Sequence, residues 1–79
     1  MNNLDRYNNV FINNFEISRD DLQGVEYQSI SAWDSVGHMG LIAALEEEFD
    51  IMMDTDDIID LSSYEKGKEI LADNYDIEF

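Results

Sequence analysis

The chain has no cysteine, no proline and one histidine among its 79 residues. Without cysteine there can be no disulfide and no cysteine-rich metal site, so a small apolar core must hold the fold. This absence also suits a cytoplasmic protein. No apolar run is long enough to span a bilayer, and no basic-then-apolar signal sequence opens the chain. We therefore expect one soluble, cytoplasmic domain over residues 1–79, with no membrane partner.

Basic residues are also scarce. The chain has 4 Lys and Arg against 19 Asp and Glu, for a formal net charge of −15, and none of the 4 lies between Asp20 and Ser63. Such a surface repels nucleic acid and anionic membranes and favours basic partner surfaces. Acidic chains can also be disordered, but 4 Phe and 4 Tyr provide material for a core. Solubility alone is a simpler explanation of the charge.

Apolar spacing predicts two long helices. The first can be capped by Asn2 or Asn3. The second covers residues 36–49, which are rich in Leu, Ala and Glu. Residues recurring at helical spacing give each helix a core face. These faces are Leu4, Tyr7, Phe11 and Phe15, with Val10 and Ile12 beside them, and Leu41, Ile42, Leu45 and Phe49.

The remaining segments predict a long loop and two further helices. Residues 16–33 are polar with spaced apolar anchors, which indicates a long, well-anchored connection. A short third helix can begin near Asp54, and Ser62 with Glu65 has the spacing of a capping box that opens a fourth. Residues 73–79 can pack or fray. The expected fold is all-α: a small four-helix bundle with a short third helix and a long loop between helices 1 and 2.

Ser35 lies where the long loop becomes the second helix. Asp34 and Ser35 are both good N-cap residues, and a plain capping role is the simpler explanation of this serine. The positive end of the helix would also tolerate a phosphate on its hydroxyl. His38 lies one helical turn further on, but a Ser–His nucleophile needs an orienting acid and an oxyanion hole as well. We therefore expect no catalytic residues and assign His38 to packing, local hydrogen bonding or contact with a group attached at Ser35.

The motif Asp34-Ser35-Val36 resembles the Asp-Ser-Leu motif of acyl carrier proteins. The run Ala44-Leu45-Glu46-Glu47-Glu48-Phe49-Asp50 resembles the end of the second helix of that family, and the similarity continues to Leu61, over about half of the chain. In that family the serine carries covalent 4′-phosphopantetheine, whose thiol holds acyl or aminoacyl groups as thioesters. The resemblance therefore implies a monomeric carrier, not an enzyme, with 4′-phosphopantetheine attached at Ser35.

The resemblance also implies partners. A phosphopantetheinyl transferase (holo-acyl-carrier-protein synthase) would supply the base and magnesium for attachment, and acyl- or aminoacyl-loading, condensing or transferase enzymes with basic surfaces would use the arm. One side of the second helix is mildly apolar with an acidic end, which suits docking, although a wide buried face fits the same spacing. The predicted docking residues are Asp34, Val36, Met39, Ala43, Glu46, Glu47, Asp54 and Asp57.

Several residues near the motif depart from the pattern common in fatty acid biosynthesis. Gly37 and Gly40 stand where that pattern tends to place acids, and Trp33 and His38 also differ. These changes favour a specialised biosynthetic pathway, such as that of a polyketide, aminoacyl or sugar-modifying carrier. The cargo itself stays open.

Two other classes of protein compete with the carrier hypothesis. An unmodified acidic protein-interaction module, including a DNA mimic, would explain the charge. A calcium-binding protein is suggested by the acids from Asp54 onward. Counting Asp54 as position 1 of an EF-hand loop, however, places Ile58 and Ile59 where a ligand and a glycine are needed. We therefore expect no dedicated metal site.

Overall fold

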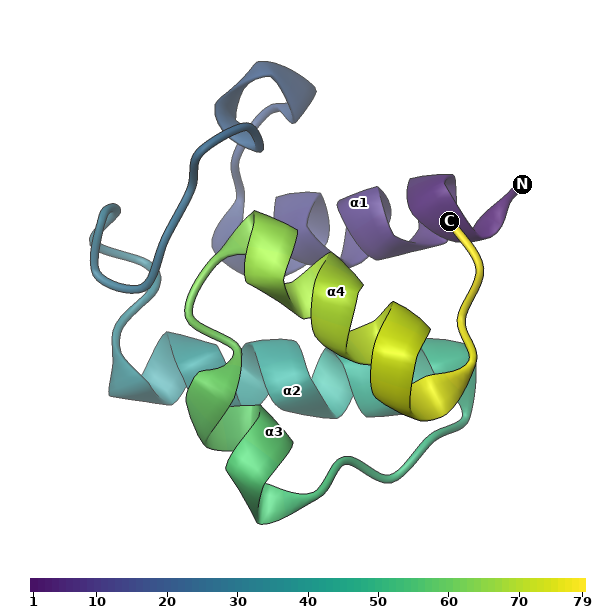
Figure 1. Cartoon of the computed structure of the whole chain (residues 1–79). Helices are drawn as coiled ribbons and strands as arrows, with labels where there is room; N and C mark the ends of the chain where they lie inside the picture. Colours follow the sequence, from purple (N-terminus) through teal and green to yellow (C-terminus); the bar gives the residue numbers. More distant parts are fainter.

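The computed structural model describes residues 1–79 as four α-helices joined by loops, with no β-strand (Figure 1). The helices are α1 (Asn3–Phe15), α2 (Ser35–Phe49), α3 (Thr55–Asp60) and α4 (Tyr64–Tyr75), and a short 3-10 turn, η1 (Arg19–Asp21), lies within the long connection. The expectation of a small all-α fold with a short third helix and a long loop after the first helix is confirmed. None of the helices combines the length and apolarity that a membrane span requires.

Local capping fixes where most of the helices begin. The side chains of Asn2 and Asp34 cap α1 and α2, and each is one of the two adjacent candidates that the sequence offered. The capping box expected at Ser62 is wrong, because the cap of α4 is Ser63, whose hydroxyl accepts from the amide of Lys66 at 3.0 Å. Ser62 lies outside the helix, and its carbonyl accepts from the amide of Tyr27 at 2.8 Å. The long loop therefore sets the start of α4.

The core lies between α1, α2 and α4. Helices α1 and α2 pack against each other, α4 crosses them, and α3 lies beside the first half of α2 (Figure 1). The predicted core face of α2 is confirmed, because all four of its residues are buried; on α1, Leu4 and Ile12 are only half-buried. The fully buried large side chains are Trp33, Tyr7, Phe11, Leu41, Leu45, Leu61 and Leu71.

The C-terminal residues return to the start of the chain. Helix α4 includes residues 73–75, and the segment after it runs back toward α1 (Figure 1). The ring of Phe79 lies 5.3 Å from that of Tyr7, and the side-chain amide of Asn3 donates to the carbonyl of Glu78 at 3.1 Å. These contacts hold residues 76–79 against α1.

Candidate functional site

Ser35 is the first residue of α2, and its side chain is exposed. The cap of the helix is the preceding Asp34, whose carboxylate accepts from the amide of Gly37 at 2.8 Å. The hydroxyl of Ser35 makes no hydrogen bond within the protein. A plain capping role for Ser35 is therefore wrong, and its hydroxyl is available for chemistry.

Backbone groups at the same helix end are also unpaired. The amides of Ser35 and Val36 precede the first intrahelical bond and have no acceptor in the protein. Such N–H groups at the positive end of a helix can donate hydrogen bonds to phosphate oxygens. The carboxylate of Asp34 adds a negative charge nearby, although one of its oxygens is already bonded to the amide of Gly37. The residues present therefore fit a phosphodiester on Ser35.

His38 ties α2 to its neighbours through both ring nitrogens. The indole N–H of Trp33 donates to its Nδ1 at 3.0 Å, and its Nε2 lies 2.7 Å from the carbonyl oxygen of Ile58 on α3. An indole can only donate and a carbonyl can only accept, so the imidazole is neutral with its proton on Nε2. We call Trp33, His38 and Ile58 the His38 brace. Neither nitrogen is left to accept a proton from Ser35, which excludes a Ser–His dyad in this geometry.

Aromatic rings continue the brace into the core. Trp33 is fully buried and stacks on Phe15, with ring centroids 5.1 Å apart. The imidazole of His38 lies parallel to the indole at 6.2 Å, and Tyr27 meets the imidazole edge-on at 5.7 Å. Tyr27, in the long loop, is exposed and packs on His38. This row of rings fixes the chain that leads into Ser35.

A groove opens beside Ser35, between the start of α2 and helix α3. Its volume is about 310 Å³. Most of its lining is apolar and none of it carries a formal charge, in contrast to the rest of this acidic surface. We call it the Ser35 groove. Its lining residues are Tyr27, Ser35, His38, Met39, Ile58, Ile59, Leu61 and Ser62.

This groove was not predicted from the sequence. Its outer wall includes Ile59, which is 71% exposed. The adjacent pair Ile58-Ile59 in a helix of six residues was the available signal, because so short a helix can bury only one of them.

The predicted docking side of α2 faces solvent. Val36 is 80% exposed and Met39 57%, and Ala43 and Glu47 are exposed further along the helix. The alternative of a wide buried face is therefore wrong. Asp34, at the start of the same helix, is exposed too. The structure thus places an apolar strip with acids at both ends next to Ser35.

Two predicted docking acids have intramolecular roles that the sequence did not reveal. Glu46 is half-buried, and its carboxylate accepts from the amide of Met53 at 2.9 Å. Asp57 accepts from the hydroxyl of Tyr75 at 2.7 Å and from the side-chain amide of Asn74 at 3.0 Å. Both carboxylates therefore stabilise the fold, which leaves them less able to serve a partner.

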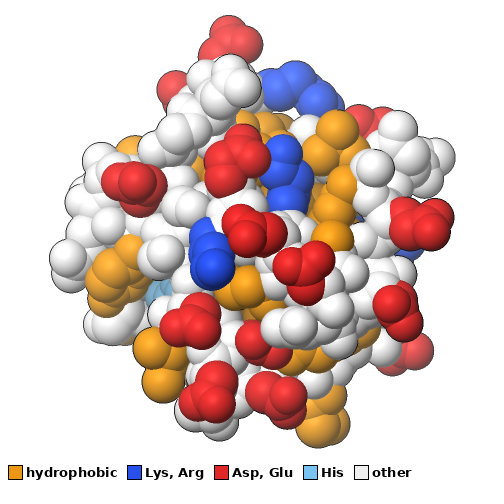
Figure 2. Space-filling model, viewed as in Figure 1, with side chains coloured by type: hydrophobic (Ala, Val, Ile, Leu, Met, Phe, Trp, Pro, Cys, Tyr) orange, Lys and Arg blue, Asp and Glu red, His pale blue; other side chains and the backbone are white.

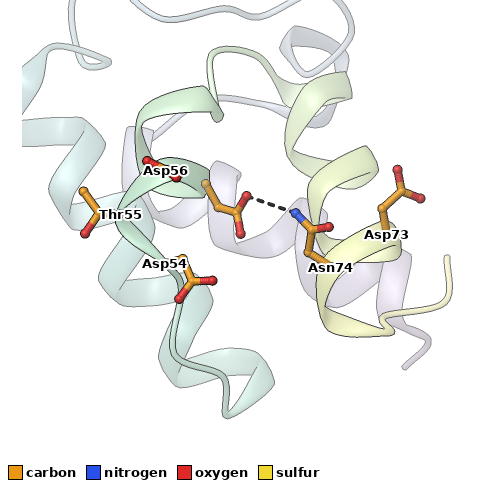
Figure 3. A pocket seen from close by; sticks show the side chains of 6 residues that line it. Asp54, Thr55, Asp56, Asp73 and Asn74 are labelled. Carbon is orange, nitrogen blue, oxygen red and sulfur yellow. Dashed lines mark hydrogen bonds between the residues drawn. The ribbon is translucent and has the colours of Figure 1, made fainter.

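An acidic cleft lies between the start of α3 and the end of α4 (Figure 3). We use the name acidic cleft for the surface lined by Asp54, Thr55, Asp56, Asp57, Asp73 and Asn74. The carboxylates of Asp54, Asp56 and Asp73 point in different directions (Figure 3). No three acidic or histidine side chains lie close enough together to hold a metal ion. The cleft gives the calcium-binding alternative no support.

The two unusual glycines of α2 differ in how closely other parts of the chain approach them. A Cβ on Gly37 would overlap the carbonyl oxygen of Ala32 in the preceding loop. A Cβ on Gly40 would lie 3.0 Å from the side-chain oxygen of Asn14, whose amide donates to the carbonyl of Gly37 at 3.2 Å. Close approach of the loop therefore accounts for Gly37, whereas only a side chain of α1 lies near Gly40.

Acidic side chains are spread over the face on which α3 and α4 lie, with a few basic ones among them (Figure 2).

Comparisons with models of known protein families, with curated proteins and with solved structures find no match to this chain. The function must therefore be argued from the site itself.

Proposed function

We propose that this protein is an acyl carrier protein in which Ser35 carries covalent 4′-phosphopantetheine. The observation that carries the proposal is the free, exposed hydroxyl of Ser35 at the start of α2, where Asp34 has taken over the capping role. The all-α fold, with its long loop before α2, agrees with the family that the motif Asp34-Ser35-Val36 resembles.

Attachment makes one bond and breaks one. The Ser35 oxygen bonds to the phosphorus next to the pantetheine of coenzyme A, the pyrophosphate P–O bond breaks, and adenosine 3′,5′-bisphosphate leaves. His38 cannot take the serine proton because both of its nitrogens are engaged. The base, like the magnesium ion, therefore belongs to the partner phosphopantetheinyl transferase. Once attached, the group supplies a thiol that holds an acyl group as a thioester.

The surface around Ser35 supports transient contact with several enzymes. Exposed Val36, Met39 and Ala43 offer a small apolar centre, and Asp34 and Glu47 offer charge at its ends. Opposite charge on a partner speeds association more than it tightens binding. We infer a cytoplasmic monomer that serves loading, condensing or transferase enzymes with basic surfaces in a specialised pathway. Asp54, exposed before α3, belongs to the same acidic surroundings.

The test is the intact mass of the protein after incubation with coenzyme A, magnesium and a broad-specificity phosphopantetheinyl transferase. The parent should gain one phosphopantetheine and the Ser35→Ala variant none. Ser31→Ala is the matched control, because Ser31 is also exposed and lies in the preceding loop; it should be modified like the parent. An unmodified but folded parent, beside a known carrier that is modified, would refute the proposal and favour the unmodified acidic interaction module.

A further inference from the structure

We propose that the hollow between α1, η1 and α4 binds a small carboxylate through the side chains of Asn8, Arg19 and Lys68. We call it the Arg19 hollow. Its volume is about 210 Å³, and its lining comes from all three elements and from the loop after η1 (Figure 1). It shares no lining residue with the Ser35 groove, so it is a second site whose ligand does not depend on a group attached at Ser35.

Basic side chains gather at this hollow although they are scarce in the chain. Two of the 4 basic residues line it, in a protein with 19 acids. The Arg19 guanidinium has no ion pair and no side-chain hydrogen bond within the protein. The Lys68 ammonium lies 4.8 Å from the centroid of the Tyr64 ring and 3.3 Å from the carboxylate of Glu65. A free guanidinium can hold a carboxylate through two parallel N–H donors.

The charges of both cations reach Tyr64, a buried residue of the lining. Burial raises the pKa of Tyr64 most and Lys68 lowers it, while Glu65 raises it and Arg19 lowers it. Both cations therefore favour a negative charge at this place. The hollow also lies at the positive end of α4, because Tyr64 and Glu65 are the first two residues of that helix. An anion is thus favoured locally, although the net charge of the chain is −15.

A buried amide adds a neutral donor. Asn8 is only 6% exposed, and its side-chain oxygen accepts from the hydroxyl of Tyr64. Its Nδ2 donates to no group of the protein, whereas no fully buried side-chain nitrogen or oxygen lacks a partner. The Nδ2 of Asn8 must therefore reach the surface, and the Arg19 hollow is the only hollow that Asn8 lines. Its N–H groups can donate there to an oxygen of a bound anion.

The balance of charge favours a carboxylate over a phosphate dianion. Arg19 and Lys68 bring two positive charges to the lining and Glu65 brings one negative charge, while the neighbouring Asp20 and Asp21 do not line the hollow. A carboxylate would neutralise the remaining positive charge, whereas a dianion would be repelled further by the acidic chain. The volume of about 210 Å³ is below the range for drug-sized ligands, roughly 300–1,000 Å³, so the ligand is a small molecule.

The test follows the binding of sodium acetate by the chemical shifts of side-chain amides, with acetate replacing chloride at constant ionic strength. The side-chain amide signals of Asn8 and Gln23, which both line the hollow, should move and saturate at millimolar acetate. Those of Asn9 and Asn13, also on α1 but lining another hollow, should not move. Acetamide, a neutral molecule of the same shape, should cause no shift, and acetate should bind more tightly than phosphate.

Four variants assign the binding to this hollow. Arg19→Gln removes the free guanidinium and should weaken acetate binding about tenfold or more. Lys66→Gln is the matched control, because Lys66 is exposed on α4, has no ion pair and lies outside the hollow; it should bind acetate as the parent does. Glu65→Gln frees Lys68 from its ion pair and should tighten binding about two- to fivefold. Ser35→Ala should bind like the parent.

The buried amide has a test of its own. Asn8→Asp keeps an oxygen to accept from the hydroxyl of Tyr64 but replaces the donor with a second carboxylate oxygen, so acetate binding should be lost. If this variant does not fold, Arg19→Gln, at an exposed residue, decides.

Three results would overturn the proposal. Shifts that do not saturate, that persist in Arg19→Gln or that acetamide reproduces would show that the hollow is no anion site. Tighter binding of phosphate than of acetate would refute the carboxylate as ligand. Glu65→Gln binding acetate no better than the parent would refute the charge balance on which this choice rests. None of these results bears on the proposed carrier function, because Ser35 takes no part in them.

Discussion

The surfaces on the two sides of α3 differ in charge and in whether their polar side chains are already hydrogen-bonded within the protein. On the side facing α2, the Ser35 groove carries no charge, and its serine hydroxyl has no partner. On the side facing α4, the acidic cleft has four carboxylates and no hydrophobic lining residue. One of these, Asp57, is already bonded to Tyr75 and Asn74. A dense cluster of acids therefore contributes mainly repulsion and fold contacts, while one unbonded hydroxyl beside an apolar groove makes the better candidate site.

Removing the brace should have the largest effect. We expect His38→Ala to lower the free energy of unfolding by about 2–3 kcal/mol, because the buried indole N–H of Trp33 loses its acceptor and α3 loses a tie to α2. In the acidic cleft, Asn74→Ala removes one exposed hydrogen bond and should cost less than about 1 kcal/mol. Urea unfolding followed by the fluorescence of Trp33, the only tryptophan, measures both. Equal losses of stability in the two variants would show that α3 is held as strongly to α4 as it is to α2.

The start of α2 should also be more sensitive to added volume than the next turn. Gly37→Ala should destabilise the protein by about 1–3 kcal/mol, because the new Cβ meets the backbone carbonyl of Ala32, which cannot move alone. Gly40→Ala meets only the side-chain oxygen of Asn14, and gains about 1 kcal/mol of helix propensity. We expect its thermal unfolding to match the parent within about 1 kcal/mol. A larger loss at Gly40 than at Gly37 would contradict this account.

Features set by neighbouring residues could be predicted from the sequence. Asn2 and Asp34 cap their helices through amides three residues away, so local residue type narrows each cap to two adjacent candidates. The core face of α2 follows from its period in the same way. The start of α4 could not be predicted, because the backbone of Ser62 is held by the amide of Tyr27, far away in the sequence.

The candidate site was predicted only in part, for the same reason. The motif placed Ser35 correctly at the start of a helix. Whether Asp34 or Ser35 would be the cap could not be read from two residues of similar propensity. The partners of His38 include Ile58 on another helix, and the exposure of Val36 depends on no further helix packing over it. These features depend on tertiary contacts between different elements, and the spacing of residues along one helix does not predict such contacts.

Alkaline pH should act on the acidic cleft through Tyr75. Burial raises the pKa of Tyr75, and its hydrogen bond to the Asp57 carboxylate raises it further, while the amide of Asp54 partly offsets this. A folded pKa above the unfolded value near 10 means that the contribution of Tyr75 to stability is complete below that pH and is lost as the pH rises through the folded value.

Tyr75→Phe tests this prediction. At neutral pH it should cost about 0.5–1.5 kcal/mol, because the phenol hydrogen bonds are lost. Above about pH 10 the gap between parent and variant should narrow, since only the parent can ionise there. Both proteins keep a further alkaline loss from Tyr7 and Tyr64, whose pKa values burial also raises. A gap that stays constant in urea unfolding at rising pH would contradict the role of Tyr75.

Salt should have the smallest effect and act mainly on the acidic cleft. Raising the ionic strength from about 0.01 M to about 1 M shortens the screening length from about 30 Å to about 3 Å. Repulsion among exposed acids should weaken, and stability should rise by about 1 kcal/mol or less.

The double variant Asp56→Asn/Asp73→Asn removes two charges of the acidic cleft and should reduce this gain in stability. Glu48→Gln is the matched control, because Glu48 pairs with Arg6 at 2.8 Å. In the parent, salt weakens the attraction between Glu48 and Arg6. Glu48→Gln removes this attraction, so the rise in stability on adding salt should be larger in the variant than in the parent. If all three proteins respond to sodium chloride alike in thermal unfolding, the charge of the cleft has no measurable influence on the fold.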